Sequence, residues 1–180
     1  MNQLKTELEN YKKWAATQSW SKAEDNKECV VIREAPSAKE MEIVAEKFGK
    51  LPSSYLETLS LFGLSEFICD GYKTKMLSPA KIIELYDVVQ GEMDFYEDYG
   101  IRELVLEEDG LDFSKYIPVM AGDGLDGCWA LLNVGENSNG EILYWDTDQS
   151  GYVGDIFPNL EAFILEAIAR AKLNNPLRLT

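Results

Sequence analysis

Hydrophobic positions recur with a helical period in the first half of the chain and form short strand-like runs in the second half. Apolar side chains three or four residues apart predict an amphipathic helix over residues 2–18. Two further periodic segments, 37–49 and 54–63, lie on either side of a Leu-Pro corner, and each ends at a glycine. The first third of the chain therefore predicts three helices.

Helix starts carry local signals. Ser37 and Ser54 each precede a glutamate by three residues, which is the pattern of a capping box. Ser78 is followed by proline and predicts another start, with an apolar face that continues to Val89. The acidic segment 91–115 shows no regular period. We expect it to be irregular and to pack on the body through its aromatic side chains.

Short apolar runs predict the strands. They cover residues 29–32, 67–70, 117–120, 128–133, 142–145 and 152–157. Glycine and aspartate separate the last four runs, as in an antiparallel meander. Asn159 is then a candidate cap for a final helix. Strands and helices do not alternate regularly, so the fold class is predicted to be α+β.

The length of 180 residues fits one domain. We interpret residues 1–36 as an N-terminal extension with a helix and a strand. Residues 37–172 form the expected domain, which contains the acidic insert 91–115, and residues 173–180 form a tail.

The sequence has no histidine, which excludes histidine-dependent catalytic triads and the usual catalytic zinc sites. The cysteines, Cys29, Cys69 and Cys128, lack metal-ligand spacing and are interpreted as buried free thiols. The glycine motifs of phosphate-binding and dinucleotide-binding loops are missing as well. Catalysis by carboxylates, lysine or tyrosine stays open at this point. We expect no cofactor.

Neither a membrane span nor a signal peptide is expected. No apolar run approaches the ~18 residues that a spanning helix needs. The first residues are charged throughout, unlike the apolar core of a signal peptide. The expected location is the cytoplasm.

Negative charge is concentrated in one part of the chain. The net charge is −15, but residues 1–83 contribute nothing to it, because they hold 12 acids and 12 bases. Residues 84–126 hold 13 acids and 2 bases and so carry −11. A field of this sign repels nucleic acids and anionic membranes and attracts basic proteins. A solvated face without a partner is the alternative.

The candidate partner-binding residues are acids of this segment together with aromatic side chains that would anchor an interface. They are Glu92, Asp94, Glu97, Asp98, Tyr99, Glu107, Glu108, Asp109, Asp112, Asp123, Asp126 and Trp129. For the aromatic side chains, packing in the core is the competing interpretation.

Two loops raise the question of a bound ion. Asp123 and Asp126 are three residues apart, which fits poorly with the alternating ligands of a calcium loop. Asp146 and Asp148 fit better, but Phe157 stands where the closing glutamate would be. A carboxylate pair for acid–base chemistry is another alternative. We favour tight turns, in which glycines supply the backbone freedom and aspartates bond to the turn, and expect no metal.

The order of several short motifs resembles the SMI1/KNR4 superfamily, also called SUKH. A Leu-Pro-x-x-Tyr corner leads into a short helix that ends at glycine. An Ile-Pro strand, an Asp-Gly loop, an apolar strand and a final helix with phenylalanine follow. The matching residues are Leu51, Pro52, Tyr55, Leu59, Gly63, Ile117, Pro118, Gly124 and Phe163.

This resemblance implies an α+β domain with a curved antiparallel sheet packed with helices. It also implies a binding role, since many bacterial members are immunity proteins that neutralise toxins used in competition between cells. The expected function is therefore a non-enzymatic module that binds a basic, nuclease-type cognate toxin through its acidic surface. The alternative is a regulatory scaffold of the cell-wall-synthesis type, with a calcium-binding protein or a carboxylate-dependent enzyme less favoured.

Overall fold

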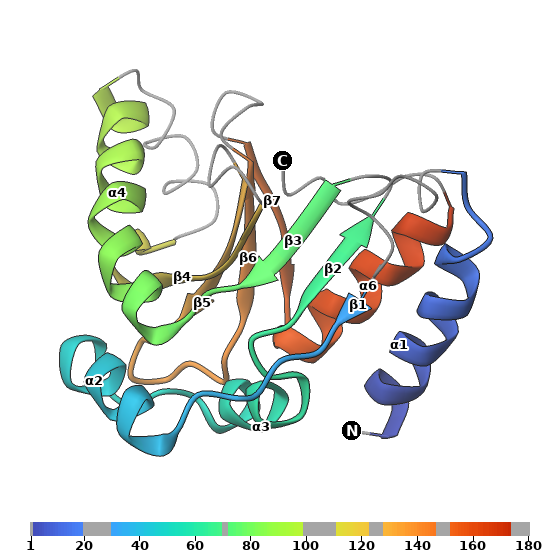
Figure 1. The fold of residues 1–180 in the computed structure, drawn as a ribbon. Coiled ribbons are helices and arrows are strands. Elements are labelled where there is room, and N and C mark those ends of the chain that lie inside the picture. The colour runs from blue at the N-terminus through green and yellow to red at the C-terminus, as the bar shows by residue number, and fades with distance from the viewer. Residues whose placement is uncertain are drawn as a thin grey trace.

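Seven antiparallel strands follow one another in sequence order across a single sheet (Figure 1). The computed structural model describes residues 2–19, 30–69, 72–98, 111–122, 128–146 and 152–173. The strands are β1 (Val30–Val31), β2 (Glu66–Cys69), β3 (Tyr72–Met76), β4 (Tyr116–Gly122), β5 (Cys128–Asn133), β6 (Ile142–Asp146) and β7 (Tyr152–Phe157). Each strand pairs with its sequence neighbours, so the predicted meander is confirmed and begins earlier than expected, at β1.

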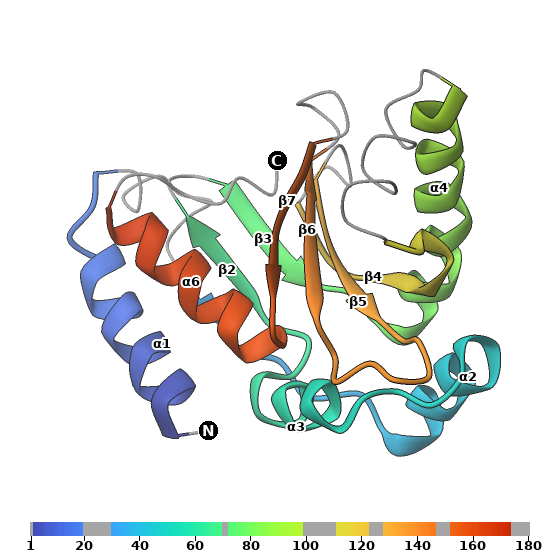
Figure 2. The ribbon, with the colours of Figure 1, turned by 180° about the vertical axis from the view of Figure 1, so that it is seen from behind.

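Helices surround this sheet, which confirms the α+β class. They are α1 (Asn2–Ala15), α2 (Ala38–Phe48), α3 (Ser53–Phe62), α4 (Pro79–Asp98), the short 3-10 helix η3 (Phe113–Lys115) and α6 (Leu160–Lys172). Helices α1 and α6 lie side by side at one end of the molecule, and α4 stands at the other end beside β4 (Figures 1 and 2).

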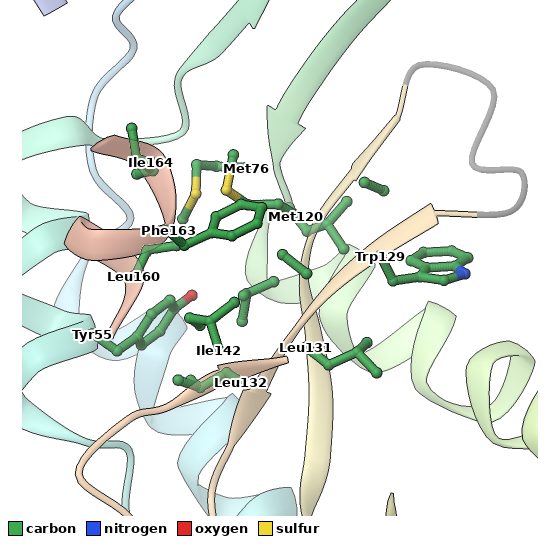
Figure 3. Packing of buried hydrophobic residues seen from close by; sticks show 14 of the residues in the cluster. Tyr55, Met76, Met120, Trp129, Leu131, Leu132, Ile142, Leu160, Phe163 and Ile164 are labelled. Atoms are coloured by element: carbon green, nitrogen blue, oxygen red, sulfur yellow. The ribbon is translucent and has the colours of Figure 1, made fainter. Parts of the chain in front are cut away.

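The core lies on both sides of the central strands. Consecutive residues of β5, from Trp129 to Leu132, are all fully buried. Because neighbouring side chains of a strand point to opposite faces, both faces of β5 must be covered. Figure 3 shows Trp129 and Leu131 on the side of α4, whereas Phe163 of α6 lies with Tyr55 on the other side.

The capping predictions had different outcomes. The box at Ser37 is confirmed, because Glu40 N–H donates to Ser37 Oγ at 3.3 Å and Ser37 N–H donates to Glu40 Oε2 at 2.7 Å. The box at Ser54 is wrong, because α3 already begins at Ser53 and Pro52 is its N-cap. The Ser54 hydroxyl instead donates to the carbonyl of Asn139 at 2.6 Å and ties α3 to the β5–β6 loop.

The beginning of the acidic insert is helical, which corrects the prediction of an irregular segment from residue 91 onward. Helix α4 continues through Gly91 to Asp98. A glycine inside a helix costs only about 1 kcal/mol relative to alanine. The buried face formed by Ile82, Leu85 and Val89 stabilises the helix by more than that.

The N-terminal helix is part of the same core. Four apolar side chains of α1 are buried: Leu4, Leu8, Tyr11 and Ala15. The Tyr11 hydroxyl donates to the carbonyl of Ile68 in β2. Lys172 of α6 pairs with Glu7 at 3.2 Å. Helix α1 therefore contributes to the stability of the sheet and of α6.

The residues of the Leu-Pro-x-x-Tyr, Ile-Pro and final-helix motifs that the structure describes have structural roles. The side chains of Leu51, Tyr55, Leu59, Ile117 and Phe163 are all buried. Gly63 ends α3 with a φ of 61°, and a Cβ there would lie 1.8 Å from the carbonyl oxygen of Arg33. Pro118 lies in β4 next to an irregularity in the register with β5, where a missing N–H is easily accommodated.

Candidate protein-binding surface

Helix α4 turns one side toward the sheet and the other toward solvent. Its exposed residues Glu84, Asp87, Val88 and Gly91 follow a spacing of three, four and seven, which places them on one face. Val88 is 48% exposed. The helix stands at the rim of the molecule (Figures 1 and 2). We call Glu84, Asp87, Val88 and Gly91 the outer face of α4.

From Glu84 onward, every charged residue of α4 is an acid. Residues 84–98 contain six acids and no base: Glu84, Asp87, Glu92, Asp94, Glu97 and Asp98. No basic residue lies in the last turn of the helix. The carbonyl groups at a helix C-terminus already carry partial negative charge, and carboxylates there add to it. The C-terminal part of α4 therefore combines acidic residues with the negative end of the helix dipole.

The structure brings a second part of the acidic segment next to α4. Tyr86 donates its hydroxyl hydrogen to the carbonyl of Ser114 at 3.2 Å, and the Gln90 amide donates to the carbonyl of Phe113 at 3.3 Å. These bonds hold η3 against α4. Asp112, which caps η3, thus belongs to the same region of the surface as α4.

Asp112 is exposed and has a structural role as well. Its Oδ1 accepts from the Ser114 backbone N–H at 3.2 Å and from the Ser114 hydroxyl at 2.6 Å. Its Oδ2 lies 3.0 Å from Lys115 Nζ. The bonds from Ser114, and then Lys115, lower the pKa of the Asp112 carboxyl. Asp112 therefore keeps its charge at neutral pH.

Trp129 was predicted as an interface anchor, and this assignment is wrong. Its side chain is fully buried on the side of β5 that faces α4 (Figure 3). The indole Nε1–H donates to Glu92 Oε2 at 3.2 Å, which satisfies the one polar atom of the ring. Glu92 thus acts as the polar partner of a core tryptophan and links α4 to the sheet.

The other predicted residues lie wholly or partly outside the described residues. The helix backbone is described at Asp94, Glu97 and Asp98, but their side chains are not. The positions outside the described ranges are Tyr99, Glu107, Glu108, Asp109, Asp123, Gly124 and Asp126. Both loops weighed as calcium sites fall there too, apart from the backbone of Asp146. Within the described ranges, no three or more Cys, Asp or Glu side chains group as metal ligands would.

Two clefts that the sequence did not reveal flank the β5–β6 loop. The larger has a volume of about 680 Å³ and lies between this loop and the α2–α3 corner, with Lys50 and Glu136 in its lining. The smaller, of about 480 Å³, lies on the other side of the loop beside Lys115. Residues some 85 positions apart meet here through the Ser54–Asn139 bond. Local sequence patterns do not reveal such a contact.

Comparison with known proteins gives one match. The model of the SMI1 / KNR4 family (SUKH-1) matches residues 35–166. No curated protein and no solved structure matches the chain. In the part of the chain that the structure describes, every helix is too short or too polar to cross a membrane.

Proposed function

Because the chain belongs to the SMI1/KNR4 family (SUKH-1), we propose that it is a non-enzymatic immunity protein that binds and neutralises a basic toxin. The toxin class that fits best is a nuclease, since enzymes that act on nucleic acids carry positive surfaces. The complex forms in the cytoplasm, where such a toxin would act.

The observation that carries this proposal is the charge of α4, with six acids and no base over residues 84–98. A patch of one sign accelerates the encounter with an oppositely charged protein, typically by 10- to 1000-fold at low salt. It also disfavours partners of the wrong charge. An inhibitor that must reach its toxin before damage occurs benefits from fast association.

The packing of α4 supports the same role. Ile82 and Val89 are fully buried, and Leu85 is nearly so. Tyr86 and Gln90 bond to the chain around η3, so a second side of the helix is fixed too. A surface held in this way loses little conformational entropy on binding, which favours affinity.

The test is co-expression with a basic nuclease toxin encoded next to this protein, followed by binding kinetics with the purified pair. We expect the wild-type protein to rescue growth, and Asp87→Lys to slow association several-fold at low salt. The control is Glu57→Lys on α3, which makes the same charge change at another exposed position. Rescue and association rates that are the same for both variants and the wild type would show that α4 does not attract the toxin.

A further inference from the structure

Gly91 lies in the interior of the 20-residue helix α4, where glycine is unfavourable. A fold uses glycine where φ is positive or where another group comes very close. The positive-φ glycines of the described chain are Gly49, Gly63 and Gly140, so Gly91 is not among them. A Cβ on Gly91 would have no atom of the described chain within 4 Å, apart from its neighbours and the backbone of its own helix. The described part of the fold therefore gives no reason for glycine here.

The position of Gly91 suggests a reason outside the fold. It lies on the outer face of α4, one turn after Asp87 and three residues after the half-exposed Val88. A glycine leaves the helix backbone bare at this point, so another main chain can approach it more closely than any side chain would allow. Val88 beside it offers apolar contact area, and Asp87 adds a carboxylate on the same outer face of α4.

We propose that a cationic polypeptide packs across α4 at Gly91, with its main chain over the bare helix backbone and basic side chains directed at the flanking carboxylates. The excess of acids over bases in residues 84–98 sets the charge of this occupant. The inference rests on the proposed function and deepens it, because it places the contact at one turn of one helix.

Site-directed photo-crosslinking tests the location. A photoreactive benzoylphenylalanine replaces Val88 in the full chain, and the control replaces Leu61 of α3, because both side chains are 48% exposed. The proteins are irradiated in cells of the source organism, and the adducts are identified by mass spectrometry. We expect at least tenfold more adduct from position 88, with a protein of basic sequence. Equal yields from both positions, no adduct, or an acidic adduct would overturn the proposal.

Gly91→Ala tests the close approach. The added Cβ favours the helix, so we expect the Tm to rise by about 2–4 °C. The affinity for the crosslinked basic protein should fall at least tenfold. The control is Ala169→Gly at an exposed position of α6, which should lower the Tm and leave the affinity unchanged. A gain of stability combined with a loss of binding is not expected from a purely structural role.

The remaining outcomes separate the two proposals. If Gly91→Ala binds normally while Asp87→Lys binds more slowly, the acidic surface is correct and the contact at Gly91 is wrong. If Gly91→Ala lowers the Tm, the fold itself requires glycine and the inference fails. If neither variant affects binding, the toxin uses another surface and the proposed role of α4 fails as well.

Discussion

Tyr55→Phe should stabilise the protein, although Tyr55 belongs to the motif that marks the family. The side chain is fully buried, and its hydroxyl has no hydrogen-bond partner among the residues that the structure describes. Figure 3 shows it among apolar side chains, including Ile142 and Leu160. Burial without a partner raises the pKa of this hydroxyl, since the surroundings disfavour the charged form. The ring therefore stabilises the core, whereas the hydroxyl opposes folding.

The magnitude follows from the desolvation of the hydroxyl. Mutational data put an unsatisfied buried hydroxyl at about 1–3 kcal/mol. The small void left by the missing oxygen offsets part of that gain. We expect Tyr55→Phe to raise the free energy of unfolding by about 1 kcal/mol, which corresponds to about 2–4 °C in Tm.

Tyr11→Phe is the matched control, because Tyr11 is equally buried and its hydroxyl donates to the carbonyl of Ile68. The same chemical change now leaves a buried acceptor without its donor and should cost about 1–2 kcal/mol. Urea unfolding followed by tryptophan fluorescence measures both variants. The reasoning is refuted if both substitutions shift the midpoint in the same direction, or if Tyr55→Phe is the more destabilising of the two.

Two further predictions concern backbone conformation and pH. Gly63→Ala should destabilise the protein by about 2–4 kcal/mol, because φ is 61° and the Cβ would collide with the Arg33 carbonyl. Gly49→Ala, with φ of 90° and open space around it, should cost clearly less in the same thermal unfolding experiment. The pKa of Asp112 is lowered in the folded state. Its charge therefore stabilises the protein at a pH above the unfolded-state pKa of about 4. This stabilisation is lost as the pH falls through the folded-state pKa. The Tm of the wild type should therefore be higher than the Tm of Asp112→Asn at pH 7, and this difference should disappear in acid. A Tm difference that does not change with pH would contradict the reasoning.

Helix ends and apolar strands were predictable because their causes are local. Ser37 caps its own helix as expected, and Asn159 Oδ1 accepts from the Ala162 N–H at 2.9 Å. The β4–β7 meander follows from apolar runs interrupted by turn residues. Strand β3 was missed, because its sequence YKTKM places lysines next to the buried Thr74 and Met76. Its side chains alternate between the core and the surface, and five residues give too short a pattern to recognise.

The candidate surface was predictable only in its charge. The composition of residues 84–126 indicates an acidic region, but the role of each side chain depends on what packs against it. Trp129 and Glu92 are 37 residues apart and form a half-buried hydrogen bond between β5 and α4. The Ser54 hydroxyl likewise bonds to a loop that is distant in sequence instead of capping its helix. Tertiary contacts override local preference at both places.

Most of the helices follow the residue preferences expected for helix ends and helix interiors, whereas α4 departs from them. A sequence shaped only by folding would place a base near the C-terminus of this helix and alanine in its interior. The last turn contains no base, and like charges recur at spacings of three and four residues. Gly91 is exposed, and a Cβ added there would meet no described group outside the backbone of its own helix within 4 Å. Each feature weakens the helix by several tenths of a kcal/mol or more. Since natural proteins depart from local consistency mainly at functional sites, the coincidence of these departures on one helix supports the proposal that α4 is the binding element.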